Sequence, residues 1–314
     1  MKKWPEIILA LMLAGVSLGL VLSGNPAARA SGSLHYTANE NFVNGVYQPG
    51  TLGFNLADVT DKATLDSAPA GVLGLVFLDG CQGATATFVN AATPLAGDPK
   101  LWGIYLADEA NGGTCTPANL KAASDWVHTH LVGAKTFIIP NNLCADASPC
   151  FSNGSNPALL PSNTDIDYFG PSAYPCKTDA PGGCDFAVIN RYVAAEQAVG
   201  MPTAAMIPVY QAFGGNNAWT DDTGGFFAVP TAAQETTILS TWASLLASPT
   251  FDYVYSWGVQ VGDTGATDIA LSDAPASLQQ VFANHNGVVA APSNLNCPVV
   301  NNPVIGQQIN CTYQ

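Results

Sequence analysis

Apolar stretches of strand length alternate, along most of the chain, with stretches whose apolar positions recur at helical spacing. The strand-like stretches, bounded by Gly, Pro, Asn or Asp, are residues 52–59, 71–80, 101–109, 134–142, 165–175, 202–214 and 251–260. The helix-like stretches between and after them are residues 61–68, 84–97, 116–133, 185–200, 231–248 and 274–285. Near-continuous apolar strands followed by helices are typical of parallel sheets covered by helices, so the pattern predicts an α/β protein.

The residues that follow the predicted strands favour a barrel over an open sheet. An open, doubly wound sheet usually carries a glycine-rich phosphate loop, and neither GxGxxG nor GxxxxGK[ST] occurs in the sequence. Polar and aromatic residues collect instead at strand ends, namely Asp58, Asp79, Asp108, Glu109, Asn141, Asn142, Tyr174, Gln211 and Trp257. Because (β/α)8 sites are assembled from the carboxyl ends of several strands, we predict a (β/α)8 TIM-like barrel, complete or irregular. Seven strands are evident, and we expect an eighth in 34–50 or in 84–95.

The first thirty residues have the layout of a cleaved secretory signal. Two lysines precede the apolar stretch 7–22, and the small-residue sequence AARA ends just before Ser31. An uncleaved membrane anchor is the alternative, which is less favoured because the cleavage site follows directly. No other stretch is long and apolar enough to span a bilayer. We therefore expect a secreted or extracytoplasmic protein with a signal peptide at 1–30, a lead-in at 31–50, the barrel at 51–286 and a tail at 287–314.

The charge of the exported chain excludes some classes of partner. Loss of the signal leaves 6 basic and 22 acidic residues and a net charge of −16. Nucleic acids and anionic lipids bind surfaces rich in Lys and Arg, so neither is an expected partner. The sequence does not indicate the oligomeric state.

All eight cysteines lie in the exported part, where disulfides are the expected state. Proximity in the sequence favours the pairs Cys144–Cys150, Cys176–Cys184 and Cys297–Cys311, which leaves Cys81 with Cys115. Zinc binding is the competing interpretation, but no CxxC pair occurs. His128 and His130 would point to different faces of a helix and would not chelate together. We therefore expect neither a metal nor a cofactor.

The stretch LWGIYLADE, residues 101–109, ends on two adjacent acids at a predicted barrel mouth. Strict alternation of a strand would place Gly103, Tyr105, Ala107 and Glu109 on the inner face. It would leave Asp108 to face outward or to support its neighbour through hydrogen bonds. A partly desolvated carboxylic acid beside another carboxylate has a raised pKa, which suits proton donation to a leaving oxygen. The alternative is that both acids cap the next helix, but Thr116 already occupies the N-cap position there.

Several motifs resemble a known family. GIYLADEAN is similar to the acid/base strand of retaining glycoside hydrolases of the large (β/α)8 superfamily, whose fourth strand ends in Asn-Glu or Asp-Glu. The order PAGVLGLVFLDG, LWGIYLADEAN, DYFGPSAYPC, GCDF, VYQAFG and YSWG resembles secreted bacterial proteins known only as glycosyl-hydrolase-like. The resemblance runs from about residue 52 to 260. It implies that Glu109 is the general acid/base, with Asp108 at the position usually held by Asn.

One strand departs from the pattern of that superfamily. Its glycosidases place a nucleophilic Glu at the end of a later strand, and the corresponding strand here ends in Gln211, whose amide cannot form a glycosyl-enzyme ester. Asp79 is the best alternative second carboxylate, with Asp58 a weaker choice. A carboxyl separation of about 5 Å from Glu109 would suit a nucleophile, and roughly 6.5–9.5 Å would suit a base. Asp79 could equally bind nearby backbone amides.

Other polar and aromatic residues complete the candidate site. Sugar rings stack on aromatic side chains through their C–H faces, so Tyr174, Trp257 and Trp219 are candidate binding residues. Asn142 and Gln211 could hydrogen-bond sugar hydroxyls. The remaining tryptophans fall within a strand or helices and are expected in the core. Asp165 and Asp167 precede their strand and are expected at the opposite, structural end of the barrel.

The sequence therefore leaves two function hypotheses. In the first, the protein is a secreted glycoside hydrolase that cleaves an extracellular carbohydrate with Glu109, Asp108 and Asp79. In the second, the barrel binds glycans without cleaving them, which Gln211 favours. A serine or cysteine hydrolase is not indicated, because no GxSxG motif occurs and the cysteines are expected to be paired.

Overall fold

Eight parallel strands form the sheet in the computed structural model, which describes residues 33–110, 115–141, 157–221, 224–288, 295–296 and 312–313. The strands are β1 (Leu34–Thr37), β4 (Leu56–Val59), β5 (Leu73–Phe77), β6 (Leu101–Ala110), β7 (Lys135–Pro140), β8 (Tyr168–Phe169), β9 (Val209–Gln211) and β10 (Phe251–Tyr255). Their order is β8-β7-β6-β5-β4-β1-β10-β9. A parallel bridge between Phe169 and Met206, with the Ile207 amide donating to the Phe169 carbonyl at 2.8 Å, joins the two ends of this order. The predicted (β/α)8 barrel is thus confirmed.

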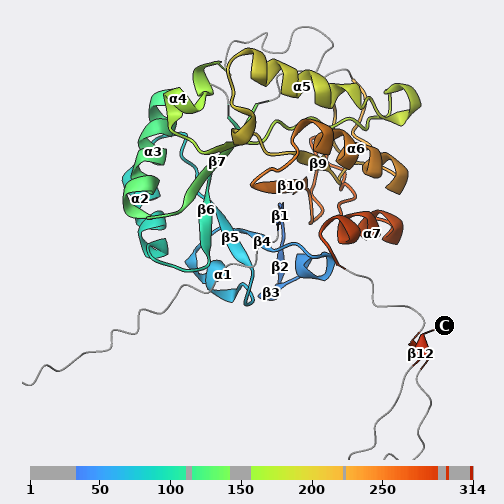
Figure 1. The fold of residues 1–314 in the computed structure, drawn as a ribbon, viewed down its shortest axis with the longest axis horizontal. Coiled ribbons are helices and arrows are strands. Elements are labelled where there is room, and N and C mark those ends of the chain that lie inside the picture. Colours follow the sequence, from blue (N-terminus) through green and yellow to red (C-terminus); the bar gives the residue numbers. More distant parts are fainter. Residues whose placement is uncertain are drawn as a thin grey trace, which may run out of the picture. The chain divides into compact units, whose positions relative to one another are not determined.

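Helices lie around the ring of strands (Figure 1). They are α1 (Lys62–Ser67), α2 (Ala86–Ala92), α3 (Pro117–His130), α4 (Pro161–Thr164), α5 (Ala187–Ala198), α6 (Ala232–Leu245) and α7 (Ala276–His285). Short 3-10 helices occupy Pro49–Leu52, Thr93–Leu95, Pro157–Leu159, Pro181–Gly183 and Thr203–Ala205. Two antiparallel pairs complete the described strands, β2 (Phe42–Val43) with β3 (Val46–Tyr47) and β11 (Leu295–Asn296) with β12 (Thr312–Tyr313). Within the described part of the chain, none of the helices combines the length and apolarity needed to cross a bilayer.

Local sequence signals explain where the longer helices begin. Thr116 is the N-cap of α3 and accepts a hydrogen bond from the Asn119 amide, and Pro117 fills the first helical position, as predicted. Thr231 and Gln234 form a capping box at the start of α6.

The barrel has two separate apolar layers. The inner layer is filled mostly by aromatic side chains, among them Tyr36, Trp102, Tyr105, Phe137, Phe251 and Tyr253. Edge-to-face contacts connect these rings, with the Trp102 and Phe251 centroids 4.8 Å apart. The outer layer packs the other faces of the strands against the helices and includes Ile104, Leu106, Leu120 and Trp242.

The eighth strand lies in the segment that the sequence suggested as a lead-in. β1 pairs with both β4 and β10, so the barrel begins at Leu34 rather than at residue 51. Residues 84–95, the other place considered for this strand, contain α2 as the helical pattern predicted. β1 was hard to recognise because it has only four residues and includes His35.

Two of the four predicted disulfides lie in the described residues, and both are confirmed. Cys81–Cys115 links the loop after β5 to the residue before the α3 N-cap, and Cys176–Cys184 closes a short loop after β8. Cys144–Cys150 and Cys297–Cys311 lie outside the described residues.

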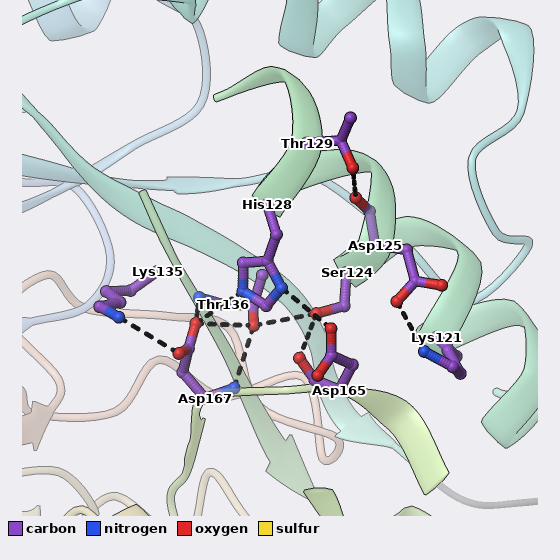
Figure 2. Close-up of polar contacts among 9 residues, drawn as sticks. All are labelled: Lys121, Ser124, Asp125, His128, Thr129, Lys135, Thr136, Asp165 and Asp167. Atoms are coloured by element: carbon purple, nitrogen blue, oxygen red, sulfur yellow. Dashed lines mark hydrogen bonds and ion pairs between the residues drawn. The ribbon is translucent and has the colours of Figure 1, made fainter. Parts of the chain in front are cut away.

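The amino end of the barrel carries a network of hydrogen bonds around one histidine (Figure 2). His128, in α3, bonds Asp165 through Nδ1 at 3.1 Å and Asp167 through Nε2 at 2.9 Å. Asp167 also accepts from the Thr136 amide at 2.9 Å and from Lys135 Nζ at 3.3 Å. These contacts join α3, β7 and the residues before β8, which confirms the expected structural position of both aspartates. His130 bonds the Trp126 carbonyl instead.

Candidate functional site

A pocket of about 320 Å³ lies at the carboxyl ends of the strands. Its lining comes from the ends of β6, β7 and β10 and from the loops that follow β8 and β9, as expected for a (β/α)8 site. Asp108 and Glu109 are both among the lining residues. The two acids at the end of β6 therefore border one hollow at the barrel mouth.

The end of β6 does not follow strict alternation. The register with β7 shifts between Tyr105 and Ala107 and again between Ala107 and Ala110, and Glu109 has a φ of +45°. The register with β5 also shifts near Trp102, between the pairs Gly74–Leu101 and Leu75–Gly103. Trp102 and Tyr105 lie in the inner layer, whereas Ala107 lies in the outer layer. Of the two alternatives for Asp108, the outward orientation does not hold, because this side chain lines the pocket together with Glu109 and accepts a hydrogen bond from the Glu109 amide.

Asp108 is held in an environment that favours its protonated form. Its side chain is exposed to the pocket, but the surrounding protein partly desolvates the carboxyl, and this desolvation raises its pKa. A hydrogen bond from the Tyr105 hydroxyl at 2.7 Å and one from the Glu109 amide act in the opposite direction but do not cancel the effect. Asp108 therefore stays protonated to a higher pH than an ordinary aspartate, which titrates near about 3.9.

A second hollow of about 240 Å³ adjoins the first and shares Asp108 and Tyr255 with it. Asp58, at the end of β4, lines this hollow and accepts hydrogen bonds from the Tyr36 hydroxyl at 2.9 Å and the Asn39 amide at 2.8 Å. Burial raises the pKa of Asp58 despite these bonds, and the charge of Asp108 raises it further. Two carboxyl groups with raised pKa values thus lie within electrostatic reach of each other.

Aromatic rings form one wall of the main pocket. Tyr174 packs edge-on against Phe213 with a centroid separation of 4.9 Å and against Phe227 with a separation of 5.8 Å. Phe213 also contacts Tyr255 at 5.0 Å. Burial raises the pKa of the Tyr174 phenol well above its usual value, so this group stays a neutral hydroxyl. The wall offers apolar faces with polar tips, a surface suited to a ligand that is both polar and flat.

The loop after β9 supplies the outer rim of the pocket, which is polar and fixed in place. The Trp219 indole N–H donates to Asp268 at 3.1 Å, and Thr220 is hydrogen-bonded to Asp263. Asp221 forms an ion pair with Lys177 at 3.3 Å. Since Trp219, Thr220, Asp221 and Asp263 all line the pocket, these contacts preorganise its rim.

Several predicted residues therefore lie together, and others do not. Asp108, Glu109, Tyr174 and Trp219 line one pocket. Asp79 accepts a hydrogen bond from the Cys81 amide at 2.8 Å, which is the structural role weighed for it, and it lines neither of the two hollows.

Two predicted binding residues are structural instead. Trp257 is 8% exposed and packs in the outer layer against the Phe54 ring. Gln211 is fully buried, accepting from the Cys176 amide at 2.8 Å and donating to the Cys176 and Ala228 carbonyls at 2.9 and 3.0 Å. The expectation that these two side chains meet a sugar is wrong, because both are committed to the protein interior. Asn142 lies outside the described residues.

Sequence reasoning missed Tyr255, Phe213 and Asp263. Tyr255 ends β10 one position before the stretch SWG that drew attention to Trp257, so alternation along β10 was the usable signal. Phe213 follows β9 directly, but Asp263 comes from a loop whose approach to Trp219 and Thr220 is set by tertiary packing.

Comparisons with solved structures show the same barrel. The C-terminal domain of a candidate chitinase from Desulfitobacterium hafniense DCB-2 is 10% identical, with a TM-score of 0.51 over 81% of this chain and 99% of that chain. A chitinase-like agglutinin from Robinia pseudoacacia is 10% identical, with a TM-score of 0.49 over 82% and 99%. A fungal endo-β-N-acetylglucosaminidase of glycosyl hydrolase family 18 is 11% identical, with a TM-score of 0.48 over 81% and 95%. No family model matches the sequence, and no curated protein matches it at a significant level. At such identities the likeness shows the fold alone.

Proposed function

We propose that the protein is a secreted glycoside hydrolase that cleaves O-glycosidic bonds of an extracellular carbohydrate in the pocket at the carboxyl end of the barrel. The observation that carries the proposal is the pair Asp108 and Glu109 in a pocket with an aromatic wall, with the pKa of Asp108 raised. Glycosidases need one carboxyl group that is protonated at working pH and a second carboxylate near the sugar. The confirmed disulfides fit an oxidising, extracytoplasmic compartment.

The geometry suggests a division of roles within the pair. Asp108 is the proton donor to the leaving oxygen, because crowding favours its acid form. Glu109 serves as the second carboxylate, near the developing positive charge of the sugar ring. The sequence resemblance instead implied that Glu109 is the general acid/base, with Asp108 at the position usually held by Asn. Asp79 is a less favoured candidate for the second carboxylate, since it already accepts a hydrogen bond from the Cys81 amide.

The two adjoining hollows suggest how a chain of sugars would lie. They share Asp108 and Tyr255, so sugar units on either side of Asp108 would occupy one hollow each. Tyr174 offers an aromatic side chain to the larger hollow, and the Asp58 carboxyl lines the smaller one. The bond to be cleaved would then lie next to the Asp108 carboxyl group.

A panel of polysaccharides tests the proposal through release of reducing ends. The unmutated protein should release sugar from at least one of them, and Asp108→Asn and Glu109→Gln should each lower the rate by about 10²–10⁴-fold. Both variants should keep binding to that polysaccharide in affinity electrophoresis. Asp125→Asn is the matched control, since Asp125 pairs with Lys121 on the exposed face of α3. Full activity in both pocket variants would refute the assignment.

Binding without cleavage is the second candidate function. It is favoured by Gln211, which places a buried amide rather than a carboxylate at the end of β9. Measurable binding to a polysaccharide, weakened by Tyr174→Ala but without release of reducing ends by any preparation, would establish this function instead.

A further inference from the structure

Three potential metal ligands meet at the amino end of the barrel, away from the proposed active site. His35 lies in β1, Asp252 is its direct partner in β10, and His285 ends α7. Asp252 Oδ2 lies 2.8 Å from His35 Nδ1 and 2.8 Å from His285 Nε2. One potential ligand atom from each residue can be chosen such that all three lie within 4.8 Å of one another.

We propose that His35, Asp252 and His285 form a binding site for one divalent transition-metal ion, with zinc as the expected occupant. Two imidazoles and one carboxylate are a ligand set that zinc uses, at about 2.0–2.2 Å from each donor atom. Tetrahedral ligation at that radius separates the donor atoms by roughly 3.3 Å, and the present separations of 2.8 Å to 4.8 Å lie on either side of this value. Ligation would therefore require the side chains to shift so that the two 2.8 Å contacts of Asp252 lengthen.

The burial of the cluster supports binding of an ion rather than simple surface pairing. The Asp252 side chain is 5% exposed, and its Oδ1 atom is buried without a hydrogen-bond partner among the described residues. An unsatisfied carboxylate oxygen in the interior is costly, and coordination or a metal-bound water would satisfy it. The His35 side chain is also buried, at 9% exposed, whereas the His285 side chain is 27% exposed. An ion can thus enter from the side of His285, where water can complete its coordination.

Surrounding rings hold the two histidines in place. The His35 and His285 rings meet edge-on with centroids 5.3 Å apart, and Tyr210 packs edge-on against His285 at 5.5 Å. The three candidate ligands come from the first strand, the last strand and the last helix of the barrel. A bound ion would therefore cross-link the two ends of the barrel segment, which makes the site structural in class and independent of the proposed hydrolase activity.

The test uses the full mature chain, stripped with EDTA and then titrated with Zn²⁺ in a calorimeter. The unmutated protein should bind one Zn²⁺ per chain and show a higher Tm with Zn²⁺ than with EDTA. His285→Gln should weaken binding at least tenfold and abolish the Zn²⁺-dependent rise in Tm. His130→Gln is the matched control, because His130 ends α3, stacks on Trp126 and should leave both readouts unchanged.

Co²⁺ provides a readout that does not depend on any variant folding. The unmutated protein should give the intense visible absorption of four-coordinate Co²⁺, and Zn²⁺ should displace it at a ratio of one to one. Absence of stoichiometric Zn²⁺ binding by the unmutated chain would overturn the proposal and leave a hydrogen-bonded His–Asp–His cluster. Equal binding by unmutated protein and His285→Gln would also overturn it.

Discussion

Asp108 at the carboxyl end of the barrel and Asp167 at the amino end are both crowded by protein atoms, and crowding alone raises the pKa of each. Their partners differ. Asp108 accepts hydrogen bonds from a neutral phenol and an amide, so its pKa stays raised. Asp167 is bonded to His128 and the Thr136 amide and lies beside the Lys135 charge, and together these lower its pKa. The residue type is the same, and the neighbouring groups decide which protonation state the fold stabilises.

The comparison implies different roles for the carboxyl end and the amino end of the barrel. A carboxyl group with a raised pKa can hold and release a proton near working pH, which serves chemistry. A carboxylate fixed in its charged form by histidine, lysine and amide groups connects secondary structure elements, which serves stability. Substitutions at each end of the barrel should separate the two roles.

Asp108→Asn should remove most hydrolytic activity while leaving the Tm within a few degrees of the unmutated value. The expected loss of about 10²–10⁴ in rate follows from removal of one acid/base group. Initial rates and a thermal melt of the same preparation provide the measurement. A large drop in Tm with activity retained would show that the carboxyl end is structural as well.

Asp167→Asn should have the opposite outcome, a loss of stability with activity preserved. The amide cannot accept from His128, the Thr136 amide and Lys135 as the carboxylate does, and loss of such partly buried bonds costs about 1–3 kcal/mol. Urea unfolding measures the change. Asp125→Asn removes an exposed ion pair on α3, the helix that also carries His128. It should change the free energy of unfolding by no more than about 0.5 kcal/mol.

The contribution of Asp167 to stability should depend on pH in the acid range. The folded-state pKa of Asp167 is lowered, so its contribution is present above the unfolded pKa of about 3.9 and is lost as pH falls through the folded pKa. The free energy of unfolding of the unmutated protein should therefore fall with pH in this window. Asp167→Asn should show a shallower fall, and parallel curves for the two proteins would contradict the assignment.

Tyr105→Phe should shift the basic limb of the pH–rate profile to higher pH. The Tyr105 hydroxyl donates to the Asp108 carboxylate and thereby lowers its pKa, so removing the hydroxyl should raise the pKa further. Since the acid form is the active one, activity should persist to a higher pH. An unshifted limb would show that Asp108 is not the group whose deprotonation ends activity.

Most of the barrel could be predicted because strand and helix periodicities are local properties of the sequence. Seven strands, the long helices and the Thr116 cap follow from patterns within a few residues. Cys176 and Cys184 are close in the sequence, and Cys81 with Cys115 is the pair left over. β1 is four residues long and contains His35. Its place in the ring depends on pairing with β4, through Leu56, and with β10, through Phe251, which is far away in the sequence. Periodicity cannot detect such pairing.

The site was predictable only in part, because the sequence shows neither the irregular register of β6 nor the hydrogen-bond partners of a buried side chain. Asp108 and Glu109 were correctly placed at a strand end, but the irregular register of β6 decides which way they face. Gln211 was assigned to the pocket, although its hydrogen-bonding groups are used by the backbone of Cys176 and Ala228. The cluster of His35, Asp252 and His285 could not be foreseen, because its members are far apart in sequence and meet only when the barrel closes.

The pairing of β1 with β10 joins the first strand of the barrel to the last. Leu34 is the register partner of Phe251, so more than two hundred residues must be available before the ring can be completed. The barrel therefore cannot close during synthesis until its last strand has left the ribosome, because β1 pairs with β10.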